Sequence, residues 1–185
     1  MIYFTADLHL GHNHIIKLVD RDFDNVEQMN ETLINNINSL VSNDDTLYLL
    51  GDLTHKVSIE EANRLIKRIN GKKILIRGNH DKQCDESLFE GIYDYYELNI
   101  QGSSYMLMHY PIRSWNKMRR GTFQLHGHIH SKKEYNLYNR EKGLYQYDVG
   151  VDANDYFPVS VDQILDFFKD VPLIDYDSDF GGIVD

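Results

Sequence analysis

Three runs of β-forming residues in the first half of the chain each end in a polar cluster, and helical patterns separate them. The runs cover residues 2–6, 46–50 and 73–77, and the clusters that follow are Asp7-Leu8-His9, Gly51-Asp52 and Gly78-Asn79-His80-Asp81. Apolar residues recur at helical spacing over residues 25–41 and again from Ser58 to a terminator at Gly71. This alternation predicts an α/β fold whose parallel strands point their carboxyl ends at one site.

Each of the two predicted helices begins with a start signal. Asp24 with Glu27 forms the pattern of a capping box before the first helix, and Ser58 with Glu61 opens the second.

The second half of the chain has a different pattern. Residues 95–100 and 104–109 predict a hairpin, further strands are expected near 123–125 and 144–151, and a helix follows Ser160 up to about Lys169. No repeat or linker divides the chain. We therefore expect one domain over residues 1–174 and an acidic, mobile tail over residues 175–185.

Composition limits the class of protein. The 185 residues are 42% hydrophobic and 26% charged, as in an ordinary globular domain. No apolar stretch approaches 18 residues and the N-terminus lacks a signal-peptide pattern, so neither a membrane span nor secretion is expected. A single cysteine, Cys84, cannot form an internal disulfide, which fits the cytoplasm. The net charge of −10 argues against nucleic acid as a partner.

A fourth cluster, Gly127-His128-Ile129-His130, and a separate His109 complete a set of donors that suits metal ions. The candidate ligands are Asp7, His9, Asp52, Asn79, His109, His128 and His130. Mixed oxygen and imidazole donors favour Mn²⁺, Fe, Zn²⁺ or Ni²⁺ over Ca²⁺ and Mg²⁺. A carboxylate such as Asp52 can bridge two cations, and such a pair can hold a hydroxide at neutral pH. His80 would then be free to protonate a leaving group, with Asp81 fixing its tautomer.

Each short motif has an ordinary explanation when taken alone. Gly-Asn-His-Asp fits a polar turn, and His-x-His is often a solvated pair. The ordered set is more specific, because strand-end placement recurs for the first three clusters.

The ordered set resembles the calcineurin-like metallophosphoesterase superfamily, whose pattern is Asp-x-His, Gly-Asp, Gly-Asn-His-Asp/Glu, His and Gly-His-x-His. The match spans residues 7–130, and its surroundings look like a small bacterial or phage branch. The resemblance implies a four-layer α-β-β-α sandwich with two mixed sheets. It implies one metal held by Asp7, His9, Asp52 and His130, and a second held by Asp52, Asn79, His109 and His128. It also implies that His80 is the transition-state histidine, with Asp81 as its partner.

Two further residues are candidates for contacting substrate. His12 directly follows the first ligand pair, and Arg113 lies four residues beyond His109. A loop histidine and a surface arginine are the alternatives.

The expected function is a dinuclear, metal-dependent phosphoesterase, with Mn²⁺ as the best-fitting ion. The expected substrate is a small phosphorylated molecule such as a nucleotide, and the sequence does not choose between a monoester and a diester. A nuclease, a protein phosphatase and a non-catalytic scaffold on the same fold are the alternatives. The sequence does not predict the oligomeric state.

Overall fold

The computed structural model describes residues 1–81 and 84–175, and its strands form two mixed sheets. The first sheet has the order β4-β3-β2-β1-β9, in which β1 to β4 are parallel and β9 is antiparallel to β1. Its strands are β1 (Ile2–Thr5), β2 (Thr46–Leu49), β3 (Lys72–Ile76), β4 (Gly91–Tyr93) and β9 (Val159–Ser160). The three β-runs predicted for the first half are therefore parallel neighbours, as expected.

The second sheet has the order β5-β6-β7-β8. Its strands are β5 (Tyr96–Ile100), β6 (Ser103–Leu107), β7 (Phe123–His126) and β8 (Gln146–Asp148). β5 and β6 form the predicted antiparallel hairpin, whereas β6, β7 and β8 are parallel. β4 and β9 were not foreseen, because runs of three and two residues are too short to show a pattern.

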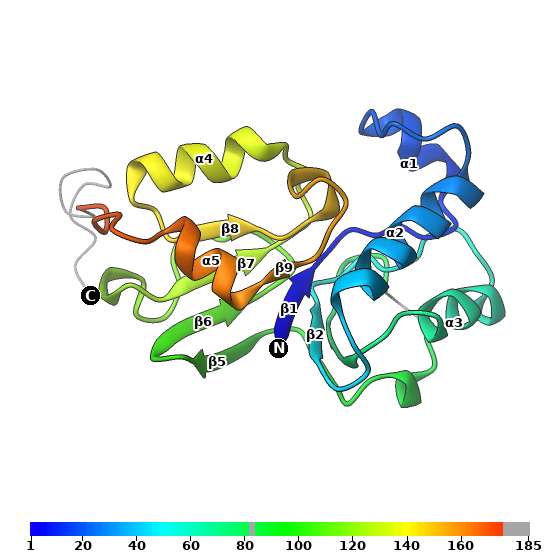
Figure 1. Cartoon of the computed structure of the whole chain (residues 1–185), viewed down its shortest axis with the longest axis horizontal. Helices are drawn as coiled ribbons and strands as arrows, with labels where there is room; N and C mark the ends of the chain where they lie inside the picture. The colour runs from blue at the N-terminus through cyan, green and yellow to red at the C-terminus, as the bar shows by residue number, and fades with distance from the viewer. Residues whose placement is uncertain (82–83, 176–185) are drawn as a thin grey trace.

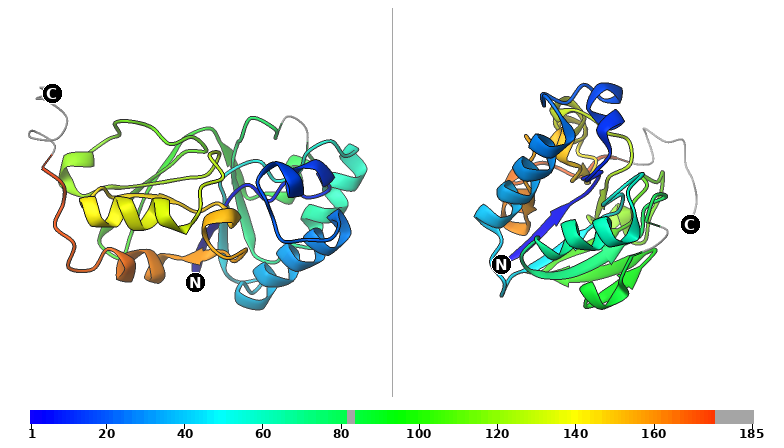
Figure 2. Two further views of the ribbon diagram at one scale, coloured as in Figure 1. Left: turned by 90° about the horizontal axis from the view of Figure 1, so that it is seen from above. Right: turned by 90° about the vertical axis from the view of Figure 1, so that its right-hand side faces the viewer.

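The helices lie on opposite flanks of the paired sheets, in the expected four-layer order. α1 (Asn13–Leu18), α2 (Val26–Leu40) and α3 (Ile59–Lys67) lie together beside the first sheet, and α4 (Lys133–Lys142) and α5 (Val161–Phe167) lie on the other side (Figure 1). The turned views keep the same grouping (Figure 2). The fold class predicted from the sequence is confirmed.

Two apolar cores separate these layers. Leu33, Leu47 and Leu75 belong to the core between α1–α3 and the first sheet. Phe4 and Leu107 belong to the core between the two sheets. Successive residues of a strand face opposite sides, so Leu47 and its neighbour Tyr48 enter different cores. The first sheet is thus buried on both faces, which fixes its register.

The start of α2 differs by one residue from the predicted cap. Asn25, and not Asp24, caps the helix, since its side chain accepts a hydrogen bond from the backbone N–H of Gln28 at 2.8 Å. The Gln28 side chain in turn accepts from the backbone N–H of Asp24 at 2.6 Å. Asn25 and Gln28 stand in the spacing of a capping box, one position further along. The Ser58 cap of α3 is as predicted.

α4 was not predicted, and its packing explains why. Its buried residues are Asn136 and Asn139, whose amides donate to the backbone oxygens of Asp148 and Gln146 in β8. A helix that binds its sheet through amides carries no apolar stripe for the sequence to reveal.

Within the described residues, no helix is both long and apolar enough to cross a membrane. The predicted mobile tail begins at residue 175, and residues 176–185 lie outside the described part of the chain.

Candidate metal centre

The segments that follow the parallel strands stay side by side after the strands have ended. The backbone N–H of Asp7 donates to the oxygen of Gly51 at 3.0 Å, and that of His9 donates to the oxygen of Asp52 at 2.9 Å. The backbone N–H of His80 donates to Oδ1 of Asp52 at 2.9 Å. The three strand-end clusters therefore meet at one edge of the first sheet, as predicted.

The candidate ligands gather in two groups. Asp7, His9 and His130 form the first cluster, and Asp52, His109 and His128 form the second. Within each cluster, one donor atom from every residue lies within 4.8 Å of the others. Asn79 joins the second cluster, because its Oδ1 lies 3.2 Å from Nε2 of His109. All seven residues predicted as ligands are thus brought together.

Asp52 lies between the two clusters. Its Oδ2 is 3.5 Å from Nε2 of His9 in the first cluster and 3.6 Å from Nε2 of His109 in the second. The carboxylate therefore faces donors of both clusters, as a bridging ligand must.

The backbone is unusual at these positions. Asp7, His9, Asp52, His128 and His130 all have positive φ, between 46° and 73°. This left-handed conformation is uncommon for residues other than glycine and costs about 1–2 kcal/mol each. Strain of this kind concentrates at functional sites. Asp7 and His9 therefore reach the same cluster through left-handed backbone beyond β1 and not through extended strand geometry.

Glycines allow the segments to approach this closely. A Cβ on Gly51, where φ is +88°, would lie 2.5 Å from Nδ1 of His109. A Cβ on Gly127 would lie 2.5 Å from Oδ2 of Asp7. Both distances are shorter than real contacts, so the Gly-Asp and Gly-His motifs need glycine for close packing.

Buried donor atoms without partners fit a bound cation. Oδ1 of Asp7 and both ring nitrogens of His9 are buried and have no hydrogen-bond partner within the described residues. Buried polar atoms are normally paired, so each exception needs an explanation, and a bound ion is one of them. A carboxylate oxygen and an imidazole nitrogen are ligands that Mn²⁺, Fe, Zn²⁺ and Ni²⁺ accept. The residues present therefore fit the divalent ions that the motif implies.

Burial and crowding shift the pKa values of the first cluster. Burial, and then repulsion from Asp148 and Asp52, raise the pKa of Asp7 well above its ordinary value. Burial, and then the neighbouring His130 and Arg21, lower the pKa of His9 to about 2. His9 is therefore neutral and able to coordinate a cation, whereas burial and the neighbouring carboxylates disfavour the charged form of Asp7 unless a cation is bound.

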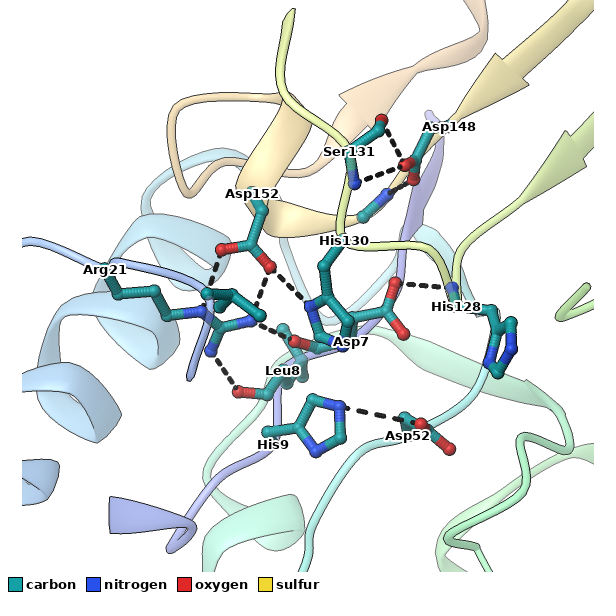
Figure 3. Close-up of polar contacts among 12 residues, drawn as sticks. Asp7, Leu8, His9, Arg21, Asp52, His128, His130, Ser131, Asp148 and Asp152 are labelled. Carbon is teal, nitrogen blue, oxygen red and sulfur yellow. Dashed lines mark hydrogen bonds and ion pairs between the residues drawn. The ribbon is translucent and has the colours of Figure 1, made fainter. Parts of the chain in front are cut away.

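The histidines of the two clusters are oriented in different ways. In the second cluster, Nδ1 of His109 donates to the backbone oxygen of Leu50 at 2.7 Å. In the first, Nδ1 of His130 lies 2.8 Å from Oδ2 of Asp152 (Figure 3). Each contact places the ring proton on Nδ1 and leaves Nε2 to bind a metal.

Asp81 has a different task from the one predicted. Its Oδ2 accepts from the backbone N–H groups of Asp52 and Gly78 at 2.7 and 2.9 Å, and its Oδ1 accepts from that of Leu53 at 2.9 Å. Both oxygens are therefore taken up in joining two ligand loops, and no contact pairs Asp81 with the His80 ring within the described residues. The sequence could not reveal the link between the loops, because two of the three contacts run to backbone atoms 28 and 29 residues away.

A row of histidine rings borders the first cluster. His80 is one-third exposed, and its ring centroid is 3.9 Å from that of His55 and 5.6 Å from that of His9. The His12 ring is 4.5 Å from His55, and both its nitrogens are buried without a partner in the described residues. Burial, and then His55 and Lys56, lower the pKa of His12 to about 4. The structure therefore brings His12 and His80 to the site.

Arg113, by contrast, is not brought to the clusters by any contact. It is exposed in the loop after β6, and within the described residues no hydrogen bond or ion pair joins it to a candidate ligand. Tyr110, from the same loop, lies closer. Its ring centroid is 4.6 Å from that of His128, and 37% of its surface is exposed.

Three charged residues near the first cluster were not predicted from the sequence. Arg21 and Asp152 form a buried ion pair behind it (Figure 3). Asp148 accepts hydrogen bonds from the Ser131 hydroxyl at 2.5 Å and from the backbone N–H of Gly150 at 2.7 Å, which fixes the loop after His130. No periodicity or motif marks these residues, because they act through contacts between distant segments.

Known proteins resemble this chain in sequence and in structure. A protein of unknown function from Aquifex aeolicus has a crystal structure that matches with a TM-score of 0.70 at 31% identity, covering 89% of this chain and 97% of that one. An uncharacterized protein from Methanocaldococcus jannaschii is 38% identical over 168 residues, which cover 89% of each chain. The gene 66 protein of Mycobacterium phage L5 is 26% identical over 200 residues, covering 91% of this chain and 94% of the phage protein.

The family comparison agrees with the motifs and with the geometry. The calcineurin-like phosphoesterase family matches residues 1–177, which include both clusters and both sheets. This chain belongs to the calcineurin-like phosphoesterase family.

Proposed function

We propose that this protein is a dinuclear metal-dependent phosphoesterase that hydrolyses monoester or diester bonds of a small phosphorylated molecule, with a nucleotide as the leading candidate. The observation that carries the proposal is the pair of ligand clusters that share Asp52. Family membership supports the same reaction class.

The residues of each cluster would hold one cation. Asp7, His9 and His130 would bind the first, Asn79, His109 and His128 the second, and Asp52 would contribute to both. When bound, such ions supply a nucleophile at neutral pH and offset negative charge on the phosphoryl group. The mixed oxygen and nitrogen donors favour Mn²⁺, with Fe, Zn²⁺ and Ni²⁺ as alternatives.

His80 would give a proton to the leaving oxygen. Its ring lies beside Asp52, with Nε2 3.8 Å from Oδ2, and one-third of its side-chain surface is exposed. A group in this position can reach both the reacting phosphate and solvent, as a general acid requires.

The surroundings of the first cluster support a small anionic substrate. His12, His55 and exposed Lys56 bring imidazole and ammonium groups together in a chain whose net charge is −10. A phosphoryl group would find donors there, whereas the acidic surface as a whole would repel a long polyanion. Tyr110, beside the second cluster, offers a ring face to a nucleobase.

Chelation and reloading test the reaction. Protein treated with chelator should lose hydrolysis of bis-p-nitrophenyl phosphate or p-nitrophenyl phosphate and recover it with Mn²⁺, saturating at two ions per chain. A folded protein loaded with two ions that cleaves no member of a broad phosphoester panel would contradict the proposal.

The variant His80→Asn separates catalysis from metal binding. Loss of a positioned proton donor lowers kcat by about 10²–10⁴-fold. Because His80 is not among the proposed ligands, the variant should still bind two Mn²⁺ ions. Retention of full activity would exclude His80 as the acid.

A further inference from the structure

A fully buried ion pair lies behind the first cluster. Nε and Nη2 of Arg21 donate to Oδ1 and Oδ2 of Asp152 at 2.9 and 2.8 Å, and both side chains have no exposed surface. The two residues are 131 positions apart and come from the loop after α1 and from the short turn Val151–Ala153 (Figure 3). A buried pair of this kind is weak evidence for stability, because desolvation offsets the attraction. The role of the pair must therefore be sought in the hydrogen bonds that it makes to the first cluster.

The carboxylate end of the pair orients a ligand. Oδ2 of Asp152 accepts from Nδ1 of His130 at 2.8 Å. Hydrogen bonds from His130 and Arg21 outweigh the effect of burial and lower the pKa of Asp152 to about 2. Because Arg21 donates to both oxygens of Asp152, the carboxylate acts as an acceptor toward His130, which places the ring proton on Nδ1 and leaves Nε2 as the donor atom for a cation.

The guanidinium end fixes the backbone of the other two ligands. Nη2 of Arg21 donates to the oxygen of Asp7 at 2.6 Å, and Nη1 donates to the oxygen of Leu8 at 3.1 Å. These carbonyls lie between Asp7 and His9, whose φ values are 58° and 49°. Such strained backbone persists only where its surroundings hold it, and the planar fork of arginine can hold two carbonyls and a carboxylate at once.

We propose that Arg21 and Asp152 are positioning residues that set the geometry of the first cluster and thereby its affinity for a cation. The inference rests on the proposed function, since it requires a metal at that cluster. His130 contacts the pair through its side chain, Asp7 contacts it through its backbone carbonyl, and His9 is linked to it through the carbonyl of the preceding Leu8. In the second cluster, by contrast, His109 is oriented by the backbone oxygen of Leu50.

Two variants test the pair. Asp152→Asn keeps the size of the side chain and removes its charge. The double variant Arg21→Met with Asp152→Leu removes both charges, a change that buried ion pairs often tolerate without loss of stability. Arg68→Gln is the control, since it breaks the solvent-accessible pair of Arg68 with Glu31.

The readouts are Mn²⁺ titration calorimetry and the imidazole nitrogen spectrum of the metal-free protein. We expect one of two Mn²⁺ ions to bind about 10–100-fold more weakly in both variants, with the other unchanged. We also expect His130 to lose its fixed Nδ1–H tautomer. Arg68→Gln should change neither readout.

The outcomes separate this inference from the proposed function. Wild-type protein that binds no cation contradicts both. Wild-type protein with two ions, and variants that bind both with unchanged affinity and retain the His130 tautomer, would overturn only the positioning proposal. Failure of both variants to fold would also overturn it, because the pair would then be needed for the fold itself.

Discussion

In the first cluster, the carboxylate of Asp152 orients His130, and Arg21 forms an ion pair with that carboxylate. In the second, the corresponding histidine rests on a backbone carbonyl at the end of β2. Asp52 faces donors of both clusters, yet His130 of the first is oriented by a side chain and His109 of the second by main chain. Side-chain support can be removed by a substitution at the supporting residue, whereas main-chain support can be disturbed only through packing.

The largest expected effect comes from the residue common to both clusters. Asp52→Asn keeps the volume of the side chain and removes the charge that two cations would share. Stabilisation by the metals is worth several kcal/mol, so kcat/KM should fall by about 10³–10⁴-fold. Calorimetry should show weakened Mn²⁺ binding at both sites. Asp44→Asn, which neutralises an exposed acid next to β2, is the matched control. Loss of only one ion would show that Asp52 belongs to a single site.

The next substitution separates the clusters. Gly51→Ala places a Cβ 2.5 Å from Nδ1 of His109 at a φ of +88°. The conformational strain of about 1–2 kcal/mol and the added crowding should lower the free energy of unfolding by about 2–4 kcal/mol. Displacing His109 should lower the affinity of the second cluster for Mn²⁺ by at least about tenfold and that of the first cluster much less.

Gly102→Ala provides the control for Gly51→Ala. Gly102 has a similar φ of +81°, but no atom lies within 4 Å of the added Cβ. It should therefore show the conformational strain alone and bind both ions normally. Equal weakening of the two ions in Gly51→Ala would contradict separate support.

The grouping of the candidate ligands was predictable from the sequence, and the contacts that support them were not. Asp7, Asp52 and Asn79 follow runs of β-formers, and parallel strands bring such ends together whatever the details of packing. Gly51 and Gly127 belong to the same local motifs. These features depend on neighbouring residues, which periodicity and spacing can express.

The supports depend on distant residues. Arg21 meets Asp152 across 131 positions, and both oxygens of Asp81 are bound to backbone N–H groups. Neither kind of contact leaves a pattern in the sequence. The same reason hid α4, whose inner face carries Asn136 and Asn139 in place of an apolar stripe. Polar contacts made in the folded state are set by geometry and not by periodicity.

The first cluster and its border should contribute to the pH dependence of the metal-free protein. Burial lowers the pKa of His9 to about 2 and that of His12 to about 4. Below about pH 6.5 the unfolded chain takes up protons on both residues that the folded chain does not, so stability falls as the pH falls. The raised pKa of Asp7 acts in the opposite direction, because the folded chain then keeps a proton that the unfolded chain has lost.

Each of the two histidines predicts a loss of about 1.4 kcal/mol per pH unit below about pH 6.5 and above its folded pKa, and Asp7 offsets part of that loss. Urea unfolding of chelator-treated protein measures this slope, and His9→Asn should flatten it. An unchanged slope in that variant would mean that His9 does not contribute to the response.

The smallest expected effect concerns how substrate lies across the two clusters. Histidines border the first cluster, whereas the exposed ring of Tyr110 lies against His128 of the second. If the phosphoryl group lies toward the histidines, a nucleobase would lie toward Tyr110. Removing that ring costs about 0.5–1.5 kcal/mol of stacking, so Tyr110→Ala should raise KM for a nucleotide substrate by about 2–10-fold. Tyr110→Phe keeps the ring and should not raise KM.

A small substrate such as p-nitrophenyl phosphate should be affected less by Tyr110→Ala. His12→Ala should affect both substrates alike, since every substrate carries the phosphoryl group. Equal effects of Tyr110→Ala on both substrates would instead place the ring against the phosphoryl group, and the two clusters would then not divide the substrate between them.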